Sequence, residues 1–492
     1  MAYENPQSSL NIPLPVVEIE QEQIMSAPLN NPPAVTDLTI WEDDPASGVF
    51  TTAPKPDLTL PPLKFLIPGA EPPLSNDVNS AAFRYWTAAE ALKRGTNFWA
   101  PIVPQPQLWQ RGGDTLEVHL DRWEDLEADY NRDALNFYHG PSPSGTVYSC
   151  ASPDVVCHEL GHAILDAIKP GLWTAHLQEV ASFHETFADM SAILCALQLP
   201  SFRQAILVET NGNLNSDSRL SRIGQQLGAA VHVLYPKDAD PNCLRNASSF
   251  FSYCDPSSLP SSALTTSLSS NPHSFSRVFT GALFEALADM LTVCAANPSA
   301  ATPNELRAVS EDMRDILASG VTNAREIPGY FAEVATTISL ASAQKNPAYP
   351  GIFLGAFVGH AILSMETAAT IQSSLNILQD EFVEMAHDRQ LAEALTVLPS
   401  SRYGLAEDLN IAMTTSPLGF IARSARTDGK SMEHTSLPVA AEAFVDELFM
   451  IGQVDYNGFG LKGFKSYGRR RSKTHELVLR DGGLTLQRRL FH

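Results

Sequence analysis

Apolar residues recur at helical spacing through much of the chain. Between residues 82 and 92 they fall on one face of a helix, and Gly95 then predicts its end. The strongest amphipathic pattern covers residues 273–296, and residues 304–318 and 328–343 show similar helical patterns. Helical signals therefore dominate the chain from residue 200 onward.

Alternating patterns predict strands in two regions. Residues 114–120 and 133–140 alternate apolar and polar side chains, as half-buried strands do. Residues 473–491 alternate on either side of Asp481-Gly482-Gly483, which is typical of a β-hairpin. The apolar run 351–363 is too short to span a bilayer and predicts a buried helix, so no transmembrane segment is expected.

These patterns predict an α+β protein of several parts, since 492 residues are too many for one core. Residues 1–60, rich in Pro, Asn and acidic side chains, predict an extended or disordered arm. The predicted parts that follow are an N-terminal α/β lobe at 61–199, a mainly helical lobe at 200–366, and a C-terminal extension with a helix and the β-hairpin at 367–492.

The charge of the chain limits its partners. A formal net charge of −22 disfavours nucleic acid, because phosphate contacts need a basic surface. The first residues lack the basic and apolar segments of a secretory signal, which predicts a cytoplasmic protein or export by another route. The basic stretch Lys462–Lys473 is typical of a solvated loop, although it could dock a partner, as could the N-terminal arm.

Cysteine usage predicts neither a disulfide framework nor a zinc ribbon. The six cysteines are sparse and include no CxxC pair, which favours reduced thiols in the core. Only for Cys243 and Cys254 does the disulfide state stay open.

The candidate chemistry lies in DVVCHELGHAILD, residues 154–166. On a helix, His158 and His162 are one turn apart on the same face, so both imidazoles can bind one metal ion with Glu159 beside it. The alternative, for this motif alone, is a helix that carries two histidines on its surface.

Local signals specify this helix well. Ser152 is a suitable N-cap, Pro153 suits the first helical position, and Pro170-Gly171 predicts the end.

A second predicted helix, LQEVASFHETFADMSAIL, adds two acidic residues. Glu185 and Asp189 fall one turn apart within an apolar stripe, where carboxylates are unfavourable unless they are paired or bind metal. With Glu185 as third ligand, the site has two histidines, one glutamate and an open position, as catalytic zinc does. Asp189 is then expected to accept the other ring N–H of a ligating histidine. One zinc ion per chain is therefore predicted.

These two motifs resemble those of the thermolysin-like gluzincin metallopeptidases, in which HExxH is followed by a helix bearing ExxxD. Downstream, LRNASS with CDP and PHSFSRVFTGALFEAL are similar to further segments of that family. The resemblance is scattered over residues 82–287 and implies a zincin-like two-lobe fold. It also implies that Arg245 contacts a substrate carbonyl and that His273 donates a hydrogen bond to the oxyanion.

The chain departs from the family pattern at several positions. The family's tyrosine after the first zinc helix falls on Trp173 or Thr174, and the asparagine of its substrate-binding edge strand falls on Ala128. Leu268 stands where the family has a carboxylate that orients the downstream histidine.

Calcium is not expected. Asp154 matches a calcium ligand of the family, but Ala196 replaces the partner acid. The resemblance therefore implies zinc alone, as in a metalloendopeptidase whose zinc-activated water gives its proton to Glu159 while His273 helps to hold the oxyanion. The expected partner is a peptide or protein substrate.

Two alternatives stay open. The chain could be a catalytically silent zincin-fold protein that serves binding or assembly, although Glu159 argues against this because a structural zinc helix needs no base. It could also be an effector protease that is delivered into cells without a signal peptide.

Overall fold

The computed structural model describes most of the chain from Asp37 onward. The described residues are 37–60, 62–104, 109, 113–297, 300–385, 393–414, 422–426, 430–432, 437–461, 473–480, 483–488 and 490–491. They combine helices with several small sheets, so the predicted α+β class is confirmed. Residues 1–36 of the predicted arm and 462–472 of the basic stretch lie outside the described part.

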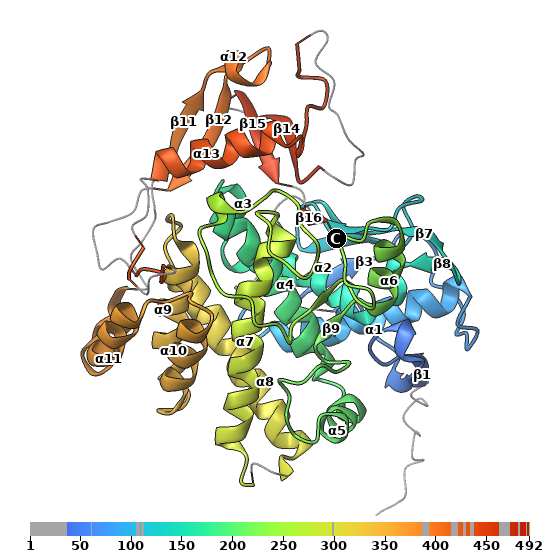
Figure 1. Cartoon of the computed structure of the whole chain (residues 1–492). Helices are drawn as coiled ribbons and strands as arrows, with labels where there is room; N and C mark the ends of the chain where they lie inside the picture. Colours follow the sequence, from blue (N-terminus) through green and yellow to red (C-terminus); the bar gives the residue numbers. More distant parts are fainter. Residues whose placement is uncertain are drawn as a thin grey trace, which may run out of the picture. The chain divides into compact units, whose positions relative to one another are not determined.

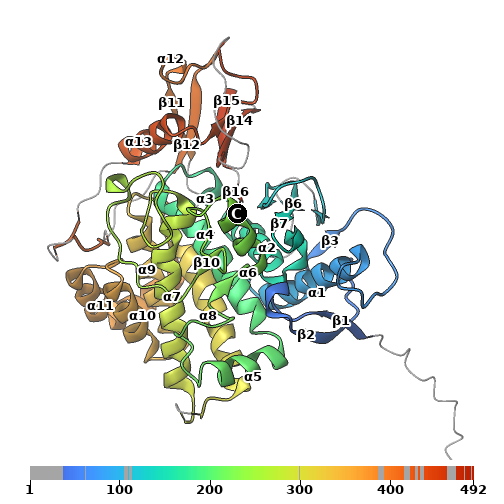
Figure 2. The ribbon, with the colours of Figure 1, turned by 45° about the vertical axis from the view of Figure 1, so that its right-hand side comes forward.

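Part of the segment predicted as an extended or disordered arm packs against the rest of the protein. Residues 37–54 form an antiparallel pair of strands, β1 (Asp37–Trp41) and β2 (Phe50–Pro54). Figure 2 shows this pair beside α1 (Ala81–Trp99). The buried contact consists of Leu38, Ile40, Ala53, Trp86 and Ala89. Only a few apolar residues of the two strands pack on α1. The average composition of residues 1–60 therefore does not indicate that the strands form.

The helix α1 continues past Gly95, where the sequence predicts a stop. At this position α1 crosses α2 (Pro153–Ile168) so closely that an added Cβ would lie 2.4 Å from Cδ2 of Leu160. The glycine therefore allows two helices to approach, and it does not end the first one.

The first sheet has five strands in the order β16-β5-β6-β4-β3. Their bounds are β3 (Lys64–Leu66), β4 (Thr115–His119), β5 (Ala128–Tyr130), β6 (Ala134–Phe137) and β16 (Leu490–Phe491). The strands β3, β4 and β6 are parallel, whereas β5 is antiparallel to β6 and β16 is antiparallel to β5. Both strands predicted between residues 114 and 140 are thus confirmed. A short hairpin of β7 (His139–Ser142) and β8 (Gly145–Tyr148) follows β6.

Three helices form the centre of the protein: α2, α4 (Gln178–Ala196) and α7 (Pro272–Cys294). The helix α4 packs against α2 and against α7 (Figure 1). The predicted start of α2 is confirmed, because the hydroxyl of Ser152 accepts a hydrogen bond from the N–H of Val155 and Pro153 is the first helical residue.

The remaining helices and short strands of this part pack on the central helices or on other elements of the same part. They are α3 (Gly171–Thr174), α5 (Pro200–Glu209), β9 (Arg222–Ile223), α6 (Gln225–Leu234), β10 (Arg245–Asn246), α8 (Pro303–Asn323), α9 (Tyr330–Ser342), α10 (Tyr349–Gly359) and α11 (Met365–Met385). The helices α7, α8 and α9 confirm the three strongest helical predictions, and α10 lies within the apolar run.

A second five-stranded sheet has the order β11-β12-β15-β14-β13 and packs against α13 (Leu437–Met450). Its strands are β11 (Glu393–Leu398), β12 (Leu409–Thr414), β13 (Val454–Asp455), β14 (His475–Arg480) and β15 (Gly483–Arg488), with α12 (Ser400–Tyr403) after β11. The strands β14 and β15 are antiparallel and pair Arg480 with Gly483, which confirms the predicted hairpin. Asp481 and Gly482 lie outside the described residues.

Two further expectations concern thiols and membranes. All six cysteines are free, so Cys243 and Cys254 form no disulfide. Among the described residues, no single helix is long and apolar enough to cross a membrane, and only the pair α4 and α5, bent by 101°, passes this test when taken together.

Candidate metal centre

The helix α2 brings His158 and His162 together as the sequence predicts. The two Nε2 atoms are 3.0 Å apart, and the ring centroids are 4.7 Å apart. Both side chains are buried, so the alternative of two surface histidines is wrong.

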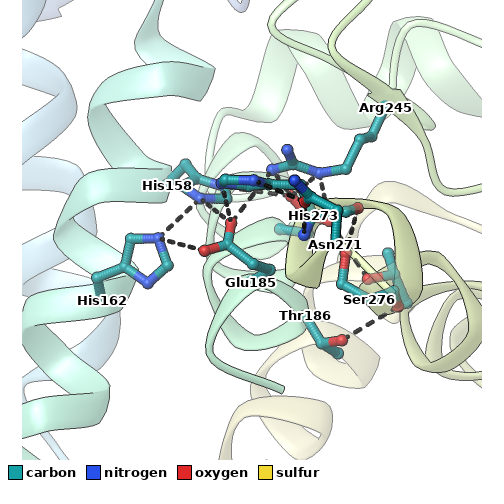
Figure 3. A network of polar contacts seen from close by, with 10 residues as sticks. His158, His162, Glu185, Thr186, Arg245, Asn271, His273 and Ser276 are labelled. Atoms are coloured by element: carbon teal, nitrogen blue, oxygen red, sulfur yellow. Dashed lines mark hydrogen bonds and ion pairs between the residues drawn. The ribbon is translucent and has the colours of Figure 1, made fainter. Parts of the chain in front are cut away.

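The helix α4 places Glu185 opposite this pair. Its carboxylate lies 3.6 Å from Nε2 of His158 and 3.9 Å from Nε2 of His162 (Figure 3). The close approach of α4 to α2 depends on Gly161, where an added Cβ would lie 2.8 Å from the Cα of Ala188. Position 161, just before His162, thus carries no side chain because a second helix occupies that space.

The facing groups lie at spacings close to those of metal ligands. Atoms at 2.0–2.2 Å from a tetrahedral zinc ion lie about 3.3–3.6 Å from one another. The two Nε2 atoms are 3.0 Å apart, and each faces a different carboxylate oxygen of Glu185, with Oε2 3.6 Å from His158 and Oε1 3.9 Å from His162. In addition, Oε2 of Glu185 is buried and has no hydrogen-bond donor among the described residues. A cation bound between these atoms would contact this oxygen directly, whereas Nη2 of Arg245 is 3.9 Å from it.

Glu159 belongs to the same group. One of its carboxylate oxygens lies within 4.8 Å of a ring nitrogen of each histidine. Its side chain is fully buried, and burial raises its pKa well above the usual range, with Asp129 and Glu185 raising it further. The arrangement therefore places a potential base beside the atoms that could bind metal.

The electrostatics of the group suit metal binding. Burial lowers the pKa of His158 and His162 well below the usual value, so both imidazoles are neutral and offer a lone pair. Burial raises the pKa of Glu185 to about 8, although the Arg245 guanidinium lowers it. Without a cation, this carboxyl is hard to ionise; a bound cation would favour its charged form.

Asp189 lies behind His158, where the sequence predicts it. Its Oδ1 is 3.1 Å from Nδ1 of His158, and the hydroxyl of Thr280 donates to its Oδ2 at 3.3 Å. Because Nδ1 faces Asp189, Nε2 of the same ring faces Glu185 and His162. The carboxylate thus orients the ring.

Arg245 on β10 is paired with the same aspartate. Its Nη2 donates to Oδ1 of Asp189 at 2.6 Å, and its Nε lies 3.1 Å from both carboxylate oxygens. Nη2 is also 3.9 Å from Glu185. The structure therefore brings Arg245 to the group, with most of its guanidinium directed at Asp189; its expected contact with a substrate carbonyl stays a prediction.

His273 reaches the group from the first turn of α7. Its Nε2 is 3.5 Å from Oε2 of Glu185, and its Nδ1 is 3.2 Å from Oδ1 of Asn271 (Figure 3). Asn271 is also the N-cap of α7, because its side chain accepts the N–H of His273. The resemblance pointed to position 268 for an orienting group, where the chain has Leu268, and so did not reveal Asn271, although an asparagine before a proline is itself a helix-start signal.

A cavity of about 310 Å³ lies beside His273. Its lining is rich in hydroxyl and charged groups and includes Arg245, Ser269, Asn271, Ser274 and Arg277. It therefore borders the candidate centre through Arg245 and His273.

Arg488 is a second residue that the sequence analysis missed. It ends β15, is 3% exposed, and donates from Nη1 to the carbonyl of Leu172 at 3.4 Å and from Nη2 to that of Ala175 at 3.0 Å. Its charge helps to lower the pKa of Glu185. No local pattern near residue 488 signals a neighbour some 300 positions away.

The carbonyls of Leu172 and Ala175, which accept hydrogen bonds from Arg488, flank Trp173 and Thr174. These are the positions on which the tyrosine of the thermolysin-like family falls. Trp173, in α3, is buried and its ring centroid lies 6.0 Å from that of His184. It carries no phenol, and the guanidinium of Arg132 lies over its ring, 4.9 Å from the centroid.

A comparison with protein-family models finds no match, and neither does a comparison with curated proteins. A functional proposal therefore depends on the geometry of the site.

Proposed function

We propose that the protein is a zinc-dependent metallopeptidase of the gluzincin type with a zincin-like two-lobe fold. The observation that carries the proposal is the buried group of His158, His162 and the Glu185 carboxylate, which face one another at 3.0–3.9 Å, with Glu159 beside the two histidines. The resemblance of the two motifs to the thermolysin-like family supports the same function.

The chemistry that zinc supplies when bound in such a site is Lewis acidity, toward water and toward a carbonyl oxygen. Glu159, which is buried beside the two histidines, takes a proton from the attacking water and passes it to the leaving nitrogen. Asp189 keeps the ring of His158 in the orientation that ligation needs.

His273 stabilises the developing oxyanion through Nε2. Nδ1 is 3.2 Å from the side-chain oxygen Oδ1 of Asn271, which can only accept a hydrogen bond. The ring can therefore donate from Nδ1 and from Nε2 at the same time only as the imidazolium. Asn271 offers an acceptor without a negative charge, and the carboxylate of Glu185 lies 3.5 Å from Nε2. Replacing His273 by Ala should lower turnover roughly a hundredfold and leave the metal content unchanged.

The decisive test is Glu159→Gln, with Glu117→Gln as the control on the exposed surface of β4. Gln has nearly the size and helix propensity of Glu but cannot accept a proton. We expect wild type and Glu117→Gln to contain about one zinc per chain and to cut an unstructured polypeptide near neutral pH. Glu159→Gln should keep the zinc and lose nearly all cleavage.

Metal analysis separates the ligand assignment from the mechanism. Glu185→Ala should lose zinc, whereas His273→Ala should keep it. Full zinc content in Glu185→Ala would refute the third ligand. Cleavage at the wild-type rate in Glu159→Gln would refute the mechanism, and absence of cleavage in every form would favour the silent binding protein.

A further inference from the structure

The strand β5 would be an open edge of the first sheet if β16 were absent. On one side β5 pairs with β6, and on the other side its partner is β16, from the far end of the sequence. The pairing is antiparallel and sets Leu490 opposite Tyr130 and Phe491 opposite Asp129. The edge is therefore closed by a segment far away in the sequence, because residues 130 and 490 are 360 positions apart.

This edge lies next to the candidate metal centre. The helix α2 packs on β5, and the hydroxyl of Tyr130 donates to Asp166 of α2 at 3.0 Å. A chain that lies along β5 thus runs beside the helix that carries the base.

An unpaired strand edge is a template for an extended peptide. Its free N–H and C=O groups bind a further strand through main-chain hydrogen bonds, largely without regard to sequence. In the structure β16 already makes this pairing, so an incoming peptide and β16 would compete for the same groups.

The segment before β16 is anchored. Arg488 is buried two residues upstream, and its guanidinium binds the carbonyls of Leu172 and Ala175, between α2 and α4. The anchor fixes where the chain leaves the second sheet and directs it toward β5. The pairing of β16 is therefore supported by a contact outside the strand itself.

We propose that β16 is an intramolecular strand that blocks the edge of β5, and that an extended polypeptide reaches the metal centre along β5 only after β16 is released. The effect on cleavage rests on the proposed peptidase function, whereas the pairing and its competition with an added peptide do not.

The test variant is Leu490→Pro/Phe491→Pro, because proline has no N–H to donate to the ladder. The matched control is Leu490→Val/Phe491→Tyr, which keeps both N–H groups and a high strand propensity. Replacing both residues by glycine gives a second disrupting variant, and circular dichroism verifies the fold of each protein.

Three measurements are made on the full chain. They are hydrogen exchange of the amides of residues 128–130, binding of a fluorescent synthetic peptide LQRRLF to the zinc-free protein, and cleavage of an unstructured polypeptide. In the proline and glycine variants we expect faster exchange, peptide binding that wild type and control lack, and cleavage raised about tenfold, which corresponds to 1.4 kcal/mol of lost pairing.

The outcomes separate the two proposals. Faster exchange and new peptide binding without cleavage in any form would support the blocking strand and refute the peptidase. Exchange and peptide binding equal to those of wild type would overturn the blocking strand, whatever happens to cleavage.

Discussion

Two buried arginine–aspartate pairs have nearly the same geometry and different consequences. Arg132, just after β5, donates to Asp166 of α2 at 2.5 and 3.0 Å. Arg245 donates to Asp189 of α4 at 2.6 and 3.1 Å. In each pair a helix carries the fully buried carboxylate, and a segment outside the helices carries the arginine.

The difference lies in the third partner of each aspartate. Asp166 also accepts from the hydroxyl of Tyr130, so its pair joins β5 to α2. Asp189 instead faces Nδ1 of His158, so its pair orients a candidate ligand. A buried ion pair therefore does not by itself indicate a functional site; what matters is whether one of its members touches a residue that can do chemistry.

The largest expected effect concerns the structural pair. Arg132→Met should leave Asp166 buried without its cation and lower the free energy of unfolding by about 3–5 kcal/mol. Zinc affinity of the folded protein should not change. Urea unfolding and metal titration measure both quantities, and Arg122→Met, on an exposed side chain, is the control. A loss of zinc affinity in folded Arg132→Met would show that the two pairs are coupled.

A buried carboxylate that has no arginine partner in the described part of the chain extends the comparison. Glu179 of α4 accepts hydrogen bonds from the hydroxyl of Tyr253 and the N–H of Phe331, both at 2.6 Å. Burial raises its pKa from 4.5 to about 7. Below pH 4.5 it is protonated in both states, but as the pH rises toward 7 only the unfolded chain loses the proton, so the folded state loses stability.

Glu179→Gln removes this titration. The free energy of unfolding of wild type relative to the variant should therefore fall by about 3 kcal/mol between roughly pH 4 and pH 8. Urea unfolding at a series of pH values measures it. A difference that does not vary with pH would mean that Glu179 ionises normally in spite of its burial.

The smallest effect concerns the functional pair and separates it from the structural one. Asp189→Asn should lower zinc affinity by roughly tenfold to a hundredfold, because the ring of His158 loses its charged acceptor. Asp166→Asn is the matched control and should leave zinc affinity unchanged. Competition with a chelator measures both zinc affinities. Equal affinities in the two variants would show that the two arginine–aspartate pairs do not differ in their effect on metal binding.

Local patterns predicted the parts of the protein that depend on nearby residues. Ser152 and Pro153 specified the start of α2, and the spacing of His158, His162 and Glu185 on two helices was enough to group them. The alternation around residues 481–482 predicted the β14–β15 hairpin.

The features that sequence analysis missed depend on distant contacts. Gly95 was interpreted as a helix stop, because the residue that requires a glycine there, Leu160, lies in another helix. Residue 160 is 65 positions further along the chain. Arg488 reaches the carbonyl of Leu172, and β16 pairs with β5, across more than 300 positions. No periodicity carries such information, because main-chain pairing depends little on side-chain identity.

The late position of β16 in the sequence has a consequence for biosynthesis. A ribosome makes about 5–20 residues per second, so the 360 positions between Tyr130 and Leu490 take roughly 20–70 s to synthesise. During that time the nascent chain has made β5 but not the strand that covers it. Long-range strand pairing of this kind forms slowly, and an uncovered edge invites pairing with other chains. The growing polypeptide therefore passes through a period in which this edge needs shielding, by a chaperone or by a nearby part of the same chain.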